Sequence, residues 1–240
     1  MDNYFVSSCK RVKDWICRQF GQKEKKTVHH KKLADGGEVI VWETGRAGEE
    51  AASYENLFLR KEIAGFRTNI RREQSCSIKS LTRDYLYKQL LSSGEYTFDH
   101  MLVIKDPYGE APLTALALFM LEEPACVRVT TKGNLKVTDF VTELPKKKEH
   151  RVPILGMYAE KANDIVIEIL DDEGNCVKSH TFTIRTKRLP KSLRNVITVK
   201  KWTDKPAYSN IMINGGVKIH TCVFDIEGKI RYYLSRKPRG

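Results

Sequence analysis

The sequence contains no long hydrophobic run and no apolar segment near its start, and each absence argues against a class of protein. The longest apolar stretch, residues 113–121, is far shorter than the roughly 18 residues that a membrane-spanning helix requires. The amino terminus has lysines and arginines but neither a continuous apolar segment nor a small-residue cleavage site, which argues against a secretory signal. We therefore expect a cytoplasmic protein by default, unless Met1 is not the true start.

The six cysteines also lack the close spacing of a metal site. No two of them form a C-x-x-C pair, and such pairs are what let a chain close a tetrahedral zinc site. Without a secretory signal, a disulfide framework is not expected either. The sequence thus predicts no metal cluster and no disulfide framework among Cys9, Cys17, Cys76, Cys126, Cys176 and Cys222. Cys126 and Cys176 lie within strand-like patterns and are interpreted as buried free thiols.

The chain does have an excess of positive charge. The formal net charge is +12, and half of that excess lies in residues 1–32. Apolar side chains at helical spacing in residues 3–21 predict a basic amphipathic helix there. Such a helix can contact an anionic surface weakly, dock on the rest of the chain or stay solvated. No helix-turn-helix, zinc-finger or RNA-binding strand pattern accompanies the charge, so no specific nucleic-acid partner is expected.

Residues 1–95 are predicted to form a basic, partly helical amino-terminal segment without an identifiable site. Residues 22–32, which include His29 and His30, are interpreted as a charged and solvated connector. Ser92-Ser-Gly94 has the composition that ends a helix. The elements predicted from periodicity are one short strand and two helices, at residues 38–43, 49–72 and 78–91.

From Tyr96 onward, short strand patterns alternate with turn signals, which is typical of an all-β sandwich. A β-turn is predicted at Asp106-Pro-Tyr-Gly109 and a tight turn at residues 171–175, whereas the basic residues 145–148 are predicted to form a loop. About seven strands in this length is the count of an immunoglobulin-like domain, which we assign to residues 96–188. The strands are expected at residues 101–104, 114–121, 126–131, 136–142, 152–158, 164–170 and 176–185.

Residues 189–240 are predicted to form a linker, a short strand and a β-hairpin. Leu189-Pro190 interrupts the strand pattern, and the short strand follows at residues 196–200. Two alternating segments, residues 217–225 and 229–234, are joined through Glu227-Gly228 and form the hairpin. A lone hairpin cannot bury its apolar face, and the sequence indicates no neighbour for it. We therefore expect the hairpin either to associate with another chain or to be disordered.

Three strings of residues together resemble one known family. They are Asp106-Pro-Tyr-Gly-Glu-Ala-Pro-Leu-Thr-Ala-Leu-Ala-Leu-Phe119, His150-Arg-Val-Pro-Ile-Leu-Gly-Met-Tyr158 and Phe224-Asp-Ile-Glu-Gly-Lys-Ile-Arg-Tyr-Tyr-Leu234. In this order they resemble the amino-terminal part of bacterial aryl-sulfate sulfotransferases, whose members are often exported. The expected fold is therefore mainly β: an immunoglobulin-like β-sandwich, preceded by a helical segment and followed by a hairpin that resembles the start of a β-propeller.

The resemblance implies transfer of a sulfuryl group from a phenolic sulfate ester to a phenol through a sulfated histidine, with no cofactor. In the family that chemistry belongs to propeller blades beyond the position of Gly240. The sequence therefore assigns no catalytic, cofactor-binding or metal-binding residue, and the chain is expected to be an inactive fragment on its own. The histidines are all interpreted as structural, with His220 in the hairpin the most tempting candidate: His29, His30, His100, His150, His180 and His220.

Partners follow from the same resemblance. A second copy of the chain is expected to bind through the amino-terminal domain or the exposed hairpin, and phenolic esters are expected as substrates only of the complete enzyme. The alternative hypothesis is a non-catalytic, immunoglobulin-like binding module with a basic amino-terminal tail that recruits an anionic partner or a membrane surface.

Overall fold

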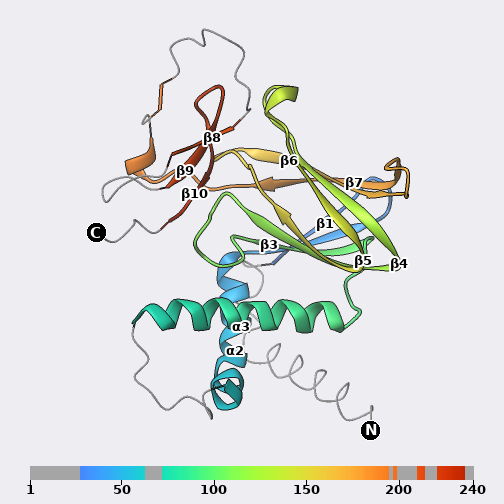
Figure 1. Ribbon diagram of the computed structural model, residues 1–240, viewed down its shortest axis with the longest axis vertical. Helices are drawn as coiled ribbons and strands as arrows, with labels where there is room; N and C mark the ends of the chain where they lie inside the picture. Colours follow the sequence, from blue (N-terminus) through green and yellow to red (C-terminus); the bar gives the residue numbers. More distant parts are fainter. Residues whose placement is uncertain (1–27, 63–71, 195–196, 199–209, 214–220, 236–240) are drawn as a thin grey trace.

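The computed structural model describes residues 28–62, 72–194, 197–198, 210–213 and 221–235. In this part of the chain two helices, α2 (Thr44–Glu62) and α3 (Arg72–Ser92), accompany ten strands (Figure 1). None of the helices in the described ranges is long and apolar enough to cross a membrane. The strands are β1 (Val28–Lys32), β2 (Glu38–Trp42), β3 (His100–Lys105), β4 (Ala115–Thr131), β5 (Phe140–Ile154), β6 (Ala162–Leu170), β7 (Cys176–Arg185), β8 (Asn210–Ile213), β9 (Cys222–Asp225) and β10 (Ile230–Tyr233).

The first seven strands form one sheet that bends back on itself. Their order is β1-β2-β3-β4-β6-β7, with β5 paired to the other edge of β4, and the only parallel pair among them is β2 with β3. The long strand β4 pairs with β3 near its start and with β6 near its end. A register shift between Met120 and Ala125 separates these two parts. Because a bulge increases local bending and twist, the two halves of the sheet face each other and the sheet is nearly closed.

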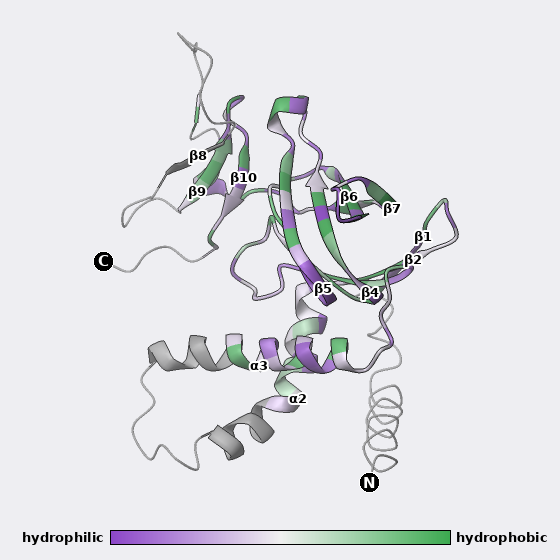
Figure 2. Cartoon of the chain, turned by 45° about the vertical axis from the view of Figure 1, so that its right-hand side comes forward, coloured by the Kyte–Doolittle hydropathy of each residue, from purple (hydrophilic) through white to green (hydrophobic). Residues whose placement is uncertain are grey.

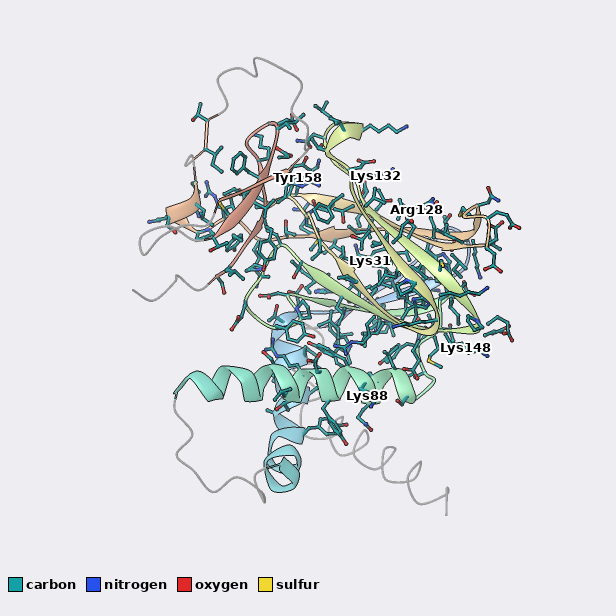
Figure 3. All side chains as sticks on the ribbon, viewed as in Figure 1. Lys31, Lys88, Arg128, Lys132, Lys148 and Tyr158 are labelled. Atoms are coloured by element: carbon teal, nitrogen blue, oxygen red, sulfur yellow. The ribbon has the colours of Figure 1, made fainter. Side chains whose placement is uncertain are left out.

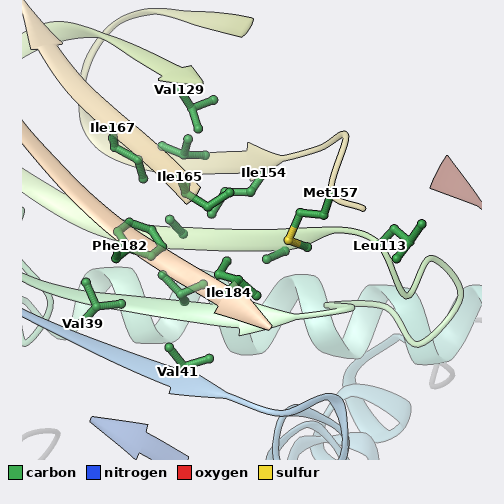
Figure 4. Packing of buried hydrophobic residues seen from close by; sticks show 14 of the residues in the cluster. Val39, Val41, Leu113, Val129, Ile154, Met157, Ile165, Ile167, Phe182 and Ile184 are labelled. Atoms are coloured by element: carbon green, nitrogen blue, oxygen red, sulfur yellow. The ribbon is translucent and has the colours of Figure 1, made fainter. Parts of the chain in front are cut away.

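The main core lies between the two halves of this sheet (Figure 4). Alternation along β2 points Val39 and Val41 into it, while Ile40 and Trp42 point to the opposite face. That opposite face packs against α2 and α3 and forms a second cluster that includes Leu86. The fold is therefore a bent sheet with a core inside and a helical layer outside.

The second sheet has the order β10-β9-β8 and also packs on the main core. Apolar stretches run along β9 and β10 in Figure 2. The side chains of Cys222, Phe224, Ile230 and Tyr233 are buried there. The expectation of a hairpin without neighbours is therefore wrong, because the chain itself supplies both a third strand and a covering surface.

Two expectations for the polar segments are also wrong. Residues 28–32, interpreted as part of a solvated connector, form β1 and pair with β2. Residues 145–148, interpreted as a basic loop, lie inside β5, which pairs with β4 on both sides of an irregularity. In each case a neighbouring strand supplies hydrogen bonds to a segment whose own composition has little strand character.

Residues 96–188 contain five longer strands instead of the seven short ones expected. The segments 114–121 and 126–131 are parts of one strand, β4, and the segment 136–142 contains a short 3₁₀ turn (Lys136–Thr138) before β5 begins. A second 3₁₀ turn covers Lys191–Leu193. The helix predicted at residues 78–91 is confirmed as α3, and Gly94 follows it with a φ of 67°. The predicted helix at residues 3–21 and His220 lie outside the described residues, as does most of the predicted strand at residues 196–200.

Candidate functional site

Two of the three strings noted in the sequence meet where the second sheet packs against the first, and the third also contacts this region (Figure 1). Tyr158, which follows β5, hydrogen-bonds to Asp225 at the end of β9. The backbone N–H of Ser235, just after β10, donates to the carbonyl oxygen of Glu110 at 2.7 Å. The Tyr158–Asp225 hydrogen bond and the buried residues around it form what we call the junction. Its members are Gly156, Tyr158, Asp225 and Arg231.

The loop after β5 holds Tyr158 by its backbone. The N–H of Tyr158 donates to the side-chain oxygen of Asn163 at 2.6 Å, and the amide nitrogen of Asn163 donates back to the carbonyl oxygen of Tyr158 at 3.0 Å. The hydroxyl of Thr186 donates to the same carbonyl oxygen at 2.5 Å. Both backbone groups of Tyr158 are therefore satisfied from β6 and from the segment after β7, and its ring is directed toward the second sheet (Figure 3).

Asp225 closes the β9–β10 turn and receives Tyr158 at the same time. One carboxylate oxygen accepts the backbone N–H groups of Glu227 and Lys229, both at 3.0 Å. The other accepts the Tyr158 hydroxyl at 2.8 Å. Gly228 provides the positive φ of 75° that the turn requires. The carboxylate is fully buried, so each of these donors offsets part of the cost of removing it from water.

Arg231 completes the junction from β10. Its Nε donates to the carbonyl oxygen of Gly156 at 2.6 Å, and its Nη1 donates to the carbonyl oxygen of Thr138 at 2.7 Å and to the Tyr158 hydroxyl at 3.0 Å. The guanidinium carbon lies 4.0 Å from the centre of the Tyr158 ring, and Nη1 is 3.4 Å from the Asp225 carboxylate. Nη2 is buried and has no hydrogen-bond partner among the described residues. The cation is thus held by an anion, an aromatic face and two carbonyl groups.

The geometry of the junction favours a structural role. Burial raises the pKa of the Tyr158 hydroxyl, so this phenol stays neutral near pH 7 and is a weak nucleophile there. Arg231 and Asp225 are both fully buried and face each other. A neutral phenol and a buried ion pair can fix two sheets in one relative orientation, because each polar group loses its partners if the sheets separate.

The first string forms a turn that α3 holds from the other side. Gly109 donates its backbone N–H to the carbonyl oxygen of Asp106 at 2.9 Å, which confirms the predicted β-turn. The side chains of Arg83 and Tyr87 both donate to the carbonyl oxygen of Pro107. Gly109 has a φ of 75°, and a Cβ at this position would lie 3.2 Å from Nη1 of Arg83. The positive φ of the turn therefore favours glycine, and a Cβ would also require the Arg83 side chain to shift slightly.

The described histidines do not gather at the junction. His29 lies 3.6 Å from Glu43, while His30 and His100 lie 2.9 Å and 3.2 Å from Glu38. His150 is buried against Phe119 and its Nε2 lies 2.8 Å from the carbonyl oxygen of Lys147; burial lowers the pKa of His150. His180 lies between Asp35 and Asp99.

The residues that build the junction are not distinguished by any motif in the sequence. Strict alternation along β10 would place the side chains of Ile230 and Arg231 on opposite faces of the strand, yet both are buried. The register of β10 with β9 shifts between Ile230 and Tyr232, and this irregularity turns Arg231 inward. The sequence features that could have indicated the junction are an Asp shortly before the turn glycine (Asp225 and Gly228) and an Arg within an apolar strand (Arg231).

Comparison with known proteins gives one finding for this region. No curated protein matches the chain. A family model, the arylsulfotransferase Ig-like domain, matches residues 102–187. That range runs from β3 to just beyond β7 and includes Gly156 and Tyr158, whereas Asp225 and Arg231 lie outside it. The described cysteines and histidines add no metal cluster, since no group of three potential ligands occurs within the described ranges. The chain therefore contains an arylsulfotransferase Ig-like domain.

Proposed function

We propose that this chain supports aryl-sulfate sulfotransfer without carrying it out: its Ig-like domain holds the β8–β10 sheet, which corresponds to the first strands of a catalytic β-propeller. The observation that carries this proposal is the junction, in which Arg231 and Asp225 of the second sheet bind Tyr158 and Gly156 of the matched domain. A support has to fix orientation, and a buried network does so more strictly than apolar contact alone.

The size of the second sheet favours the same role. A sheet of three short strands is marginal in water unless one face is covered. Phe224, Ile230 and Tyr233 are buried in the same cluster as Leu113 and Met157, which lie just before β4 and just after β5. The Ig-like domain therefore stabilises strands that would not be stable alone.

The chemistry of the described histidines is consistent with a supporting role. A histidine that attacks sulfur must be neutral and must present a free ring nitrogen to the substrate. His150 is buried against a backbone carbonyl, whereas His29, His30 and His100 each face a glutamate with one ring nitrogen and keep the other, so the assay below decides for these three. Both ring nitrogens of His180 face carboxylates.

The test is transfer of sulfate from 4-nitrophenyl sulfate to phenol by the purified chain, followed as 4-nitrophenolate absorbance. We expect no release of 4-nitrophenolate above a buffer blank. Turnover that is lost in the variant His220→Ala would overturn it, because it would place the reacting histidine within these residues. Turnover that survives His220→Ala would overturn it equally, and variants of His29, His30 and His100 would then locate the site.

A further inference from the structure

The sheet is nearly closed, and its two end strands meet without a backbone ladder. Strand β1 pairs with β2 and strand β7 pairs with β6, and no pairing joins β1 to β7 within the described strands. Side chains bridge the gap instead. The ammonium group of Lys31 on β1 donates to both the carbonyl oxygen and the hydroxyl of Thr183 on β7. We call this boundary between β7 and the β1–β2 ribbon the seam.

His180 lies at the centre of the seam, in a position that faces the core. Along β7 the buried positions are His180, Phe182 and Ile184, so the histidine occupies a place that alternation gives to an apolar residue. Only 1% of its side chain is exposed, and its ring stacks on Phe98 at 4.4 Å between ring centres. A polar ring at such a position is stable only if both of its nitrogens have partners.

Both partners are carboxylates, and they come from different segments. Nδ1 lies 2.5 Å from Asp35 in the β1–β2 turn, and Nε2 lies 2.9 Å from Asp99 just before β3. The hydrogen bond from Lys178, with a further contribution from His180, holds the pKa of Asp99 below its usual range. The pKa of Asp35 is also lowered, because the Gly37 N–H and His180 together outweigh the opposing effect of burial. The carboxylates of Asp35 and Asp99 are therefore both ionised near neutral pH and can only accept hydrogen bonds.

This geometry requires the protonated form of the ring. An ionised carboxylate can only accept, and a neutral imidazole has one N–H, so a neutral ring can donate to one of the two carboxylates and must turn a lone pair toward the other. The imidazolium has two N–H groups and satisfies both. Of the other charged groups in the seam, Lys178 binds Asp99 and Lys31 binds Thr183.

The backbone closes tightly over the ring. A Cβ on Gly37 would lie 3.1 Å from Cε1 of His180 and 3.2 Å from the carbonyl oxygen of Asp99. That carbonyl oxygen accepts the N–H of Glu38 at 2.7 Å, and the N–H of Leu33 donates to the carbonyl oxygen of Gly37 at 2.7 Å. These two amides lie at the base of the turn that Asp35 fastens to His180, so their protection should fall when the turn leaves the ring.

We propose that His180 is a protonation-controlled latch that closes the seam. In the imidazolium form the ring holds the β1–β2 turn through Asp35 and the start of β3 through Asp99. In the neutral form one carboxylate is released, and Asp35 is the one that leaves, because Lys178 continues to hold Asp99. The seam is thus closed while the ring carries both N–H groups, and it loosens when one of them is lost.

Amide hydrogen exchange of the full chain tests this proposal. We expect the protection factors of Leu33 and Glu38, corrected for intrinsic exchange, to fall about tenfold or more from about pH 5.5 to about pH 8.5. The amides of Val127 and Val129 in β4, which β6 separates from β7, serve as the internal reference and should not change. Histidine ring ¹⁵N spectra should show two N–H groups on His180 at the lower pH.

The decisive variant is Asp35→Asn. The introduced carboxamide can donate to Nδ1 of a neutral ring, while Nε2–H still donates to Asp99, so the pH dependence should shrink to less than about threefold. This variant also separates the latch from Glu38, which faces His30 and His100 and adds its own pH response. Unchanged protection of the seam amides across the pH range, or a pH dependence equally large in Asp35→Asn, would overturn the proposal.

Discussion

The hydroxyl of Tyr158 donates to the carboxylate of Asp225 at 2.8 Å, and 67 positions of sequence separate the two residues. Tyr158 belongs to the matched Ig-like domain and Asp225 to the second sheet. The same hydroxyl accepts a hydrogen bond from Arg231 and another from the backbone N–H of Asn134 at 3.1 Å. One phenolic oxygen thus connects both sheets and the segment between β4 and β5.

Tyr158→Phe should lower the free energy of unfolding by about 1–3 kcal/mol, because it leaves the buried Asp225 carboxylate without one of its donors. Urea unfolding followed by circular dichroism measures the difference. Tyr232→Phe is the matched control: its hydroxyl makes no hydrogen bond within the described part of the chain, and its loss should change stability by less than about 0.5 kcal/mol. Equal effects of the two changes would contradict a specific role for the Tyr158 hydroxyl.

A double-mutant cycle between Asp225 and Arg231 should show strong coupling. Asp225→Asn or Arg231→Met alone leaves one buried charge without its counter-ion, at a cost of about 3–5 kcal/mol. The double variant removes both charges, so it should cost clearly less than the sum of the single variants. Equilibrium unfolding of the three variants gives the coupling energy. Additive effects would mean that the two charges do not stabilise each other across the junction.

The elements that depend on local chemistry could be predicted from the sequence. Helix α3 has its own periodicity, the turn at Asp106-Pro-Tyr-Gly109 has its own turn residues, and Glu227-Gly228 joins β9 to β10 as expected. Strand β1 and the middle of β5 could not be predicted in this way. His29, His30 and the lysines of residues 146–148 carry no strand signal, and these segments are extended because β2 and β4 pair with them.

The junction could be predicted only in part. The apolar side chains of the hairpin indicate that it needs a covering surface, and Tyr158 and Asp225 both lie in strings that resemble the family. Their meeting could not be derived, because the anchors of Tyr158 are Asn163 and Thr186, two polar residues that mark no motif. The inward orientation of Arg231 depends on a register shift that only the pairing of β9 with β10 reveals.

Gly156→Ala should be more destabilising than Gly174→Ala. Both glycines have positive φ, 76° and 84°, so alanine costs about 1–2 kcal/mol at either site. A Cβ on Gly156 would also lie 2.6 Å from Cβ of Phe140, whereas Gly174 has no atom within 4 Å of the same position. The added crowding should raise the cost at Gly156 by a further 1–3 kcal/mol or so. Thermal unfolding of the two variants compares them, and similar losses would show that the loop before Tyr158 can shift.

Asp106→Asn should stabilise the chain at pH 7. Burial raises the pKa of the Asp106 carboxyl above its unfolded value, so the stability that this group contributes is present at acid pH and is lost as pH rises. An amide oxygen can still accept the N–H of Ala111, and asparagine tolerates the φ of 44°. The difference in melting temperature between variant and wild type should therefore vanish below about pH 3.

Asp171→Asn serves as the control, because its expected change in melting temperature at pH 7 has the opposite sign. Hydrogen bonds from Asn175 lower the pKa of Asp171, so its contribution is present at neutral pH and is lost as pH falls. This variant should lower the melting temperature at pH 7 and match the wild type in acid. If both variants shift the melting temperature in the same direction at pH 7, the opposite environments of the two carboxyls do not govern their effects.

Replacing Lys146, Lys147 and Lys148 together by valine should make the chain associate. Among the described strands β5 pairs with β4 alone, so its other edge offers unpaired backbone groups over a strand of 15 residues. Lysines and Pro145 on such an edge oppose pairing with another chain, because a partner strand would have to bury their charge. Light scattering after size exclusion should show larger species in this variant than in the wild type.

The control changes Lys187, Arg188 and Lys191 to valine, which removes equal charge from exposed residues outside any strand, and it should leave the size distribution unchanged. Equal association of both variants would mean that net charge, and not the edge of β5, keeps the chains apart.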